Sequence, residues 1–119
     1  MAPPASLLGR APLAQMRRGV VEYCVLALLE RRERYAVELV AVLTRHGLIG
    51  GEGTIYPLLS RLRKQGLVET TWQESDTGPP RRYYRVSPEG AAALEQFVRD
   101  WTALTTSVQG IIAGEDDLA

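Results

Sequence analysis

The chain has 119 residues, the length of one domain, and its 45% of hydrophobic residues allow only a modest core. A single cysteine, Cys24, excludes an intrachain disulfide framework and suits a reducing compartment. No run of about 18 apolar residues indicates a membrane span, and residues 1–12 lack the basic start and long apolar core of a signal peptide. We therefore expect a cytoplasmic protein in which residues 1–12 are a flexible lead-in.

Charge is unevenly distributed along the chain, although its 14 basic and 14 acidic residues balance. Residues 1–90 contain 13 Lys and Arg against 9 Asp and Glu, whereas residues 91–119 contain 1 against 5. The basic part favours a polyanionic partner, because DNA affinity depends on neutralising phosphates. We interpret residues 113–119 as an acidic C-terminal tail that serves solubility.

Two helices are expected in the first part of the chain. Leu13–Arg31 and Tyr35–His46 both place apolar residues at helical intervals. The charged segment Arg31–Arg34 links them, and Gly47–Gly51 forms the turn after the second helix. This second helix, the turn and the next helix are predicted to form a helix-turn-helix pair.

The next helix has a buried stripe, because Ile55, Leu58, Leu59 and Leu62 recur at i, i+3, i+4 and i+7. Gly66 is expected to end the helix in a left-handed conformation. The opposite face is polar and partly basic, and in a major groove the first residues of such a helix meet the base edges. The residues that we expect to contact DNA from this helix are Thr54, Tyr56, Pro57, Ser60, Arg61 and Lys64.

A hairpin, or wing, is predicted after this helix. Leu67–Glu74 and Arg81–Ser87 are rich in β-branched and aromatic residues, and Ser75–Pro80 between them forms a turn cluster with two prolines that stiffen the tip. Arg81 and Arg82 would then touch phosphate or enter a minor groove. The alternative is that they only keep an exposed hairpin soluble. Their attachment to the preceding helix favours DNA.

The last helix begins with Ser87 as N-cap and Pro88 as its first residue. Its apolar residues alternate steps of three and four, which is typical of a coiled-coil seam. A seam requires a partner, so the helix is predicted to dimerise; the alternative is that it packs onto its own domain. A two-fold dimer would bind an inverted repeat with half-sites about one DNA turn apart. The seam residues are Leu94, Phe97, Trp101, Leu104, Val108 and Ile111.

Together these patterns predict an α+β fold that is mostly helical. Residues 13–87 would form a winged helix-turn-helix domain that binds double-stranded DNA, and residues 88–112 would form a C-terminal dimerisation helix.

Several separated motifs, in this order, resemble the PadR-type transcriptional regulators. They are Gly-Thr-Ile-Tyr-Pro at 53–57, Gly66-Leu67, Arg82-Tyr83-Tyr84, and Ser87 with Glu89-Gly90. The resemblance begins near Met16 and continues to about Ile112. It implies a dimeric, usually repressing, DNA-binding protein whose last helix forms the dimer, and family members often respond to phenolic or other planar aromatic compounds.

Trp101 lies in the middle of the predicted seam, where a large aromatic ring either fills a dimer core or leaves a slot for a flat ligand. The resemblance to ligand-responsive regulators implies that a small aromatic effector is as plausible here as simple core packing. The walls of such a slot would come from the first and last helices. Besides Trp101, the candidates are Phe97, Leu104, Met16, Val20 and Tyr23.

Enzymatic chemistry has little support. The only histidine, His46, stands near a helix end, where capping or solvent exposure is the expected role. Cys24 lies among apolar helical neighbours and is expected to pack rather than sense redox state. We therefore predict no catalytic residue, no cofactor and no metal. The alternatives are a winged-helix interaction module without sequence-specific DNA binding and, more remotely, a small metal or redox sensor.

Overall fold

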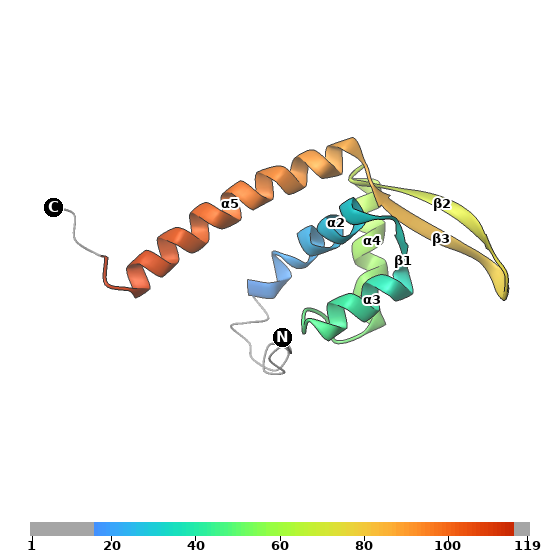
Figure 1. The fold of residues 1–119 in the computed structure, drawn as a ribbon, viewed down its shortest axis with the longest axis horizontal. Helices are drawn as coiled ribbons and strands as arrows, with labels where there is room; N and C mark the ends of the chain where they lie inside the picture. The colour runs from blue at the N-terminus through green and yellow to red at the C-terminus, as the bar shows by residue number, and fades with distance from the viewer. Residues whose placement is uncertain (1–15, 116–119) are drawn as a thin grey trace.

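The computed structural model describes residues 16–115. Within this range three shorter helices and a small sheet form a compact body from which a long C-terminal helix extends (Figure 1). The predicted lead-in at residues 1–12 and the last residues of the predicted tail lie outside the described residues.

The first helix, α2, spans Val21–Arg31 and is shorter than predicted. The prediction of one continuous helix from Leu13 was wrong, because residues 16–18 form a separate helical turn and a turn at Gly19 and Val20 precedes α2. Glycine loses more backbone entropy in a helix than any other residue, which explains why the helix is interrupted at this point.

The helix-turn-helix prediction is confirmed. Helix α3 spans Ala36–Arg45, and Gly47 ends it with a φ of 73°, while its N–H donates to the carbonyl of Thr44. A short 3-10 turn, η2 (Glu52–Thr54), leads into α4, which spans Ile55–Lys64. Gly66 closes α4 with a φ of 75°, the left-handed stop that was expected.

The wing consists of β2 (Val68–Ser75) and β3 (Gly78–Val86). It forms one antiparallel sheet of order β1-β3-β2 with β1, a strand of only Arg34 and Tyr35 that lies in the predicted link and was not foreseen. The predicted six-residue turn was also wrong, because β3 already begins at Gly78. Pro79 and Pro80 are tolerated in the strand since the β2–β3 register is irregular here and β1 pairs with β3 only at Tyr83 and Tyr84.

The hydrophobic core lies between α2, α3 and α4 and extends to the base of the wing. The predicted stripe of α4 is buried as expected, with Ile55, Leu59 and Leu62 completely inaccessible to solvent. Leu26 of α2 and Leu39 of α3 are equally buried and face the same core. Burial of one side of α4 therefore fixes which side remains available to a partner.

The long helix α5 spans Pro88–Ile112, and its start is as predicted. The Ser87 hydroxyl accepts a hydrogen bond from the N–H of Gly90 at 3.0 Å and donates one to the carbonyl of Gly66 at 2.6 Å. Leu94 is only 7% exposed and belongs to the core of its own chain, so its assignment to a dimer seam was wrong. The first turns of α5 thus pack onto the chain's own domain, as the alternative prediction stated, and contact α2. The rest of α5 extends away from the folded body (Figure 1).

Candidate nucleic-acid interface

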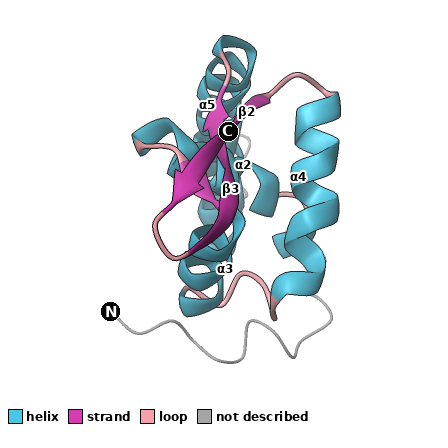
Figure 2. Cartoon of the chain, turned by 90° about the vertical axis from the view of Figure 1, so that its right-hand side faces the viewer, coloured by secondary structure: helices cyan, strands magenta, loops and turns pink. Residues whose placement is uncertain are grey.

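Helix α4 lies at one side of the molecule beside the wing (Figure 2). Its outer face, opposite the buried stripe, presents the predicted DNA-contacting residues Tyr56, Pro57 and Lys64 as exposed side chains, with Thr54 exposed just before the helix and Ser60 half-buried. The helix therefore offers hydroxyl groups and a positive charge on one continuous surface. A helix of ten residues with one buried face has the dimensions to enter a major groove.

Arg61 lies toward one flank of this face rather than at its centre. Its guanidinium donates to the Glu22 carboxylate of α2 at 3.4 Å. The same flank has a hollow lined by Arg17, Arg18 and Arg61 together with apolar residues of α2 and α4. Arg17 and Arg18 were not predicted as part of the DNA interface, although a basic pair beside a helix-turn-helix is a signal of such a surface.

The other flank is a hollow of about 330 Å³ between α4, the start of α3 and the wing. Tyr56 contributes to it from α4, and Trp72, Arg81 and Arg82 contribute from the wing. The Arg81 guanidinium lies 4.6 Å from the centre of the Tyr35 ring, and that of Arg82 lies 5.4 Å from the centre of the Trp72 ring. The structure thus brings the predicted wing arginines and Tyr56 together. It adds two aromatic residues that the sequence analysis had not assigned to DNA.

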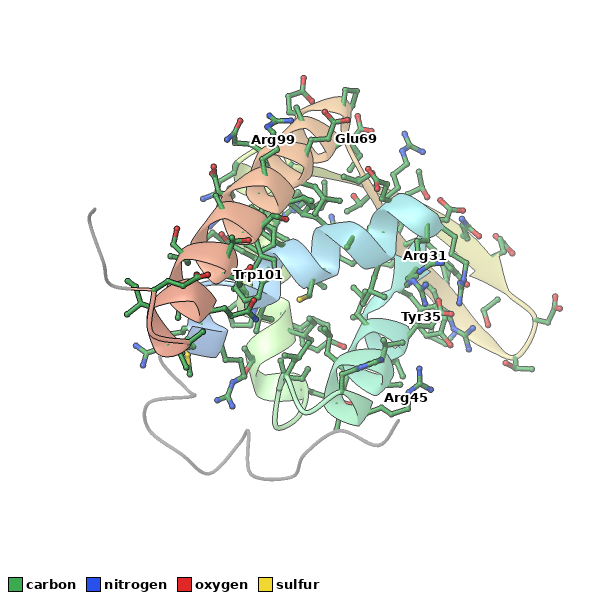
Figure 3. All side chains as sticks on the ribbon, turned by 60° about the vertical axis from the view of Figure 1, so that its left-hand side comes forward. Arg31, Tyr35, Arg45, Glu69, Arg99 and Trp101 are labelled. Carbon is green, nitrogen blue, oxygen red and sulfur yellow. The ribbon has the colours of Figure 1, made fainter. Side chains whose placement is uncertain are left out.

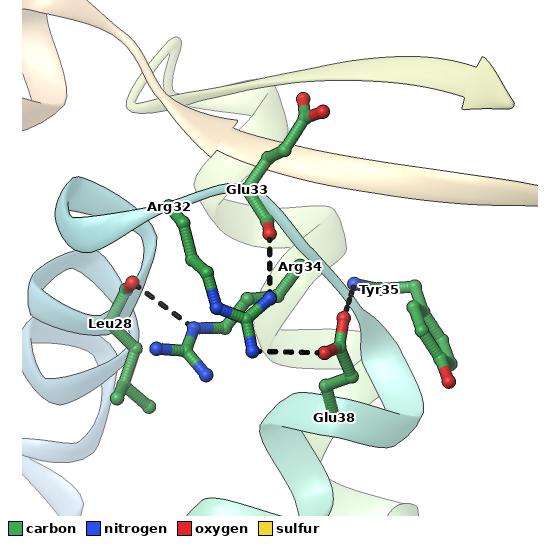
Figure 4. Close-up of polar contacts among 6 residues, drawn as sticks. All are labelled: Leu28, Arg32, Glu33, Arg34, Tyr35 and Glu38. Carbon is green, nitrogen blue, oxygen red and sulfur yellow. Dashed lines mark hydrogen bonds and ion pairs between the residues drawn. The ribbon is translucent and has the colours of Figure 1, made fainter.

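Two arginines in the link between α2 and α3, Arg32 and Arg34, form structural contacts. Figure 4 shows Arg32 donating to the Glu38 carboxylate at 3.1 Å and Arg34 donating from Nε to the carbonyl of Leu28 at 3.2 Å. Burial, reinforced by the nearby Arg32, lowers the pKa of the Arg34 guanidinium from its ordinary value. These contacts stabilise the link between α2 and α3, so the two arginines do not add to the surface that α4 and the wing present.

The second predicted site lies on α5, where Phe97, Trp101 and Leu104 face Met16 and Val20 across an open hollow of about 510 Å³. Figure 3 shows Trp101 on α5. Tyr23, predicted as a wall, is not part of the lining; it stacks on Phe97 with ring centres 4.3 Å apart and an interplanar angle of 4°. Tyr23 therefore packs against Phe97, which lines the hollow. The other predicted ligand residues all line the hollow.

Residues 16–115 were also compared with the patterns of a metal site and of a membrane-spanning helix. No group of three or more His, Cys, Asp or Glu side chains there is arranged to hold a metal ion. Within the same range, no helix is both long and apolar enough to cross a membrane. Cys24 is half-buried, and burial raises the pKa of its thiol, which makes it a poor nucleophile at neutral pH.

The comparison with known proteins agrees with this geometry. The family model described as "Transcriptional regulator PadR-like family" matches residues 25–96, which is more than half of the chain. The chain belongs to the PadR-like family of transcriptional regulators. It is therefore a winged-helix DNA-binding regulator, and the sequence resemblance to PadR-type proteins is confirmed.

Individual relatives of this PadR-like protein match over most of its length. It is 32% identical to transcriptional regulator Rv3488 of Mycobacterium tuberculosis over 107 residues, which cover 90% of this chain and 96% of the relative. A PadR-like transcriptional regulator from Bacillus cereus has a similar structure, with a TM-score of 0.77, 40% identity, and coverage of 84% of this chain and 98% of the other. A PadR family regulator from Eggerthella lenta gives a TM-score of 0.78 at 33% identity and covers 87% and 91% of the two chains.

Proposed function

We propose that this PadR-like regulator is a homodimeric repressor that binds an inverted-repeat operator. The observation that carries the proposal is the row of exposed apolar side chains on α5, where Trp101 is 45% and Ile111 is 67% exposed in the single chain. Leu104 and Val108 continue the row between them. Apolar surface of this extent on a helix that projects from the folded body favours association, because burial removes it from water.

A second copy packed along α5 would relate two α4 helices by a two-fold axis. Recognition helices related in this way enter successive major grooves about 34 Å apart, roughly one turn of DNA. The operator would then have inverted half-sites with that spacing. Repression would follow from occupying the sequence that RNA polymerase requires.

The proposal includes relief of repression by a small planar aromatic compound. The hollow beside Trp101 supports this, because its wall is formed by Phe97, Trp101 and Leu104 and is mainly apolar. The Phe97 and Trp101 rings lie 5.8 Å apart at an interplanar angle of 23°, so a flat ligand could extend the same stack. A ligand that binds the two states of the dimer unequally would shift DNA affinity.

The test is selection of bound sequences from random duplex DNA by the purified full chain, followed by titration of the selected duplex at several salt concentrations. Enrichment of an inverted repeat with half-sites about one turn apart would support the dimeric regulator. No enrichment, with weak or absent salt-dependent binding, would overturn it and favour a winged-helix interaction module.

Lys64→Ala tests the orientation of the recognition helix on the selected duplex. We expect weaker binding, an intact dimer, and a salt dependence that falls by about one unit of slope, because one phosphate contact is lost. Arg99→Ala is the matched control, since Arg99 is an exposed cation on α5 away from the DNA-facing surface. Equal losses for both variants would show that only net charge matters.

Effector binding is tested separately with a panel of simple phenols and fused-ring aromatics. We expect some to quench tryptophan fluorescence and release DNA from the wild-type protein. Met16→Ala, which changes the wall opposite α5 and leaves the exposed row of α5 intact, should weaken both responses while DNA binding without effector remains. Unchanged DNA affinity with every compound would overturn the effector part of the proposal alone.

A further inference from the structure

Arg81 and Arg82 of the wing differ from three other surface arginines in what they contact. Arg32, Arg61 and Arg85 each form an ion pair with a carboxylate, at N–O distances between 3.1 and 3.4 Å. Arg81 and Arg82 instead lie over the rings of Tyr35 and Trp72. Among the described residues neither has a carboxylate partner.

This difference determines whether each guanidinium can still bind a phosphate. A carboxylate neutralises the charge and occupies the N–H groups that would bind a phosphate. An aromatic ring attracts the cation through its face and leaves the charge in place, with the N–H groups directed outward along the edge of the guanidinium plane. Arg81 and Arg82 are therefore held in position and remain available as phosphate ligands.

The register of the wing explains the contact between Trp72 and Arg82. The two residues are direct partners in the β2–β3 ladder, so their side chains lie on the same face of the hairpin. Trp72 is 66% exposed, which is costly for so large an apolar ring unless a partner covers it. The Nε atom of Arg82 is buried and has no hydrogen-bond partner, so the described part of the chain leaves this donor unsatisfied.

The hollow at this place lies between the two elements that hold DNA in a winged helix. Tyr56 lines it from α4, and Trp72, Arg81 and Arg82 line it from the wing. When a helix occupies the major groove and a wing reaches the adjacent minor groove, the sugar-phosphate backbone that separates the grooves must pass between them. That backbone supplies both the anionic oxygens and the sugar surface that the hollow would contact.

We propose that Trp72 and Tyr35 are positioning residues that hold Arg82 and Arg81 as ligands for backbone phosphates of the DNA strand between α4 and the wing. This inference rests on the proposed function and adds the residues that orient the two arginines of the wing. Neither aromatic residue carries charge, so their effect on DNA binding is exerted through the arginines.

The test is a double-mutant cycle of Trp72→Ala and Arg82→Ala in the full-length protein, measured on the selected duplex. Trp72→Ala should weaken binding by about 3- to 30-fold, the range that corresponds to a cation–π contact. Trp72→Phe should restore most of the loss, because a ring remains. The double variant should bind about as weakly as Arg82→Ala alone, since the ring acts through the arginine.

Salt dependence separates positioning from loss of charge. Arg82→Ala should lower the slope of log affinity against log salt by about one unit, whereas Trp72→Ala should lower it less because the cation is still present. Arg85→Ala is the matched control on the same strand, since Arg85 is paired with Glu69, and its effect should be smaller than that of Arg82→Ala. Tyr35→Phe should bind like wild type, and Tyr35→Leu should weaken binding by less than Arg81→Ala does, because the Arg81 cation is still present.

The outcomes distinguish failure of the proposed function from failure of the role proposed for Trp72 and Tyr35. Wild-type protein without salt-dependent DNA affinity would overturn the proposed function and this inference together. A wild type that binds tightly, with additive losses in the Trp72 and Arg82 cycle or no rescue by Trp72→Phe, would overturn only the inference. Circular dichroism and thermal melting of each variant ensure that losses are compared between folded proteins.

Discussion

Arg61 of the recognition helix donates a hydrogen bond to Glu22 of α2 at 3.4 Å. In the free chain an acidic side chain thus holds a guanidinium that lies at the edge of the DNA-facing surface. Both partners are partly exposed to solvent, so their mutual attraction is weak and a DNA phosphate can compete for Arg61. This contact couples the orientation of Arg61 to α2, the helix that carries part of the core.

Glu22→Gln should therefore strengthen DNA binding, because it frees Arg61 and removes a negative charge from the flank. The expected gain is up to about fivefold at low salt, given the small free energy of exposed ion pairs. Fluorescence anisotropy with the selected duplex measures it. Glu69→Gln is the matched control, since it frees Arg85 and changes the net charge equally. Weaker binding by Glu22→Gln would show that Glu22 holds Arg61 in its DNA-binding orientation.

Two glycines near the base of the wing should respond differently to alanine. A Cβ at Gly90 would overlap the carbonyl of Leu67 and lie 2.8 Å from Cγ2 of Val86, so the backbone must shift. At Gly66 there is open space, and only the positive φ of 75° opposes a side chain. We expect Gly66→Ala to lower the free energy of unfolding by about 1 kcal/mol and Gly90→Ala to lower it by more. Urea unfolding at one protein concentration provides the comparison, and the reverse order would contradict the close approach at Gly90.

Leu59 and Leu104 should separate the stability of the fold from the stability of the dimer. Leu59 is fully buried, and its replacement by alanine should cost about 2–5 kcal/mol of unfolding free energy through lost burial and a cavity. Leu104 is 59% exposed in the single chain, so Leu104→Ala should leave the core intact and weaken self-association instead. Sedimentation equilibrium measures the dimer dissociation constant of each variant. An unchanged dimer for Leu104→Ala would remove this residue from the dimer contact.

Cys24 should react slowly in the folded protein. Burial raises the pKa of its thiol above the ordinary value of 9.0, so the thiolate fraction at pH 8 is smaller than in the unfolded chain. Alkylation by iodoacetamide at pH 8 should be slower in buffer than in urea. Rapid alkylation of the folded chain would contradict the raised pKa.

The same shift predicts how stability depends on pH. The pKa of the Cys24 thiol is higher in the folded chain than in the unfolded chain. Its contribution to the free energy of unfolding is therefore complete below the unfolded pKa of about 9 and is lost as the pH rises through the folded pKa. Relative to Cys24→Ala, the wild-type protein should lose unfolding free energy between pH 8 and pH 10. The difference between the two proteins isolates this group from the other titratable groups, which both proteins share. Parallel pH profiles would contradict the linkage.

Apolar periodicity in the sequence predicted α3, α4 and the length of α5, and β-branched and aromatic residues predicted the two strands of the wing, although not where β3 begins. The stops at Gly47 and Gly66 and the cap at Ser87 were equally readable, since they depend on local backbone chemistry. The exposed face of α4 followed from its buried face. Most residues of α4 and the wing that we propose as DNA contacts could therefore be placed on exposed faces from the sequence pattern alone.

Contacts between distant segments depend on tertiary packing, which no local sequence pattern specifies. Strand β1 has two residues and no period of its own, and it exists because Arg34 and Tyr35 pair with β3. Leu94 fits the apolar repeat of α5 as well as Leu104 does, and packing of the start of α5 onto the folded body makes Leu94 a core residue and leaves Leu104 exposed. The ring partners of Arg81 and Arg82 depend on strand register and on a contact between β1 and β3. A single-residue shift in register would place Trp72 on the opposite face from Arg82, which no local pattern in the sequence specifies.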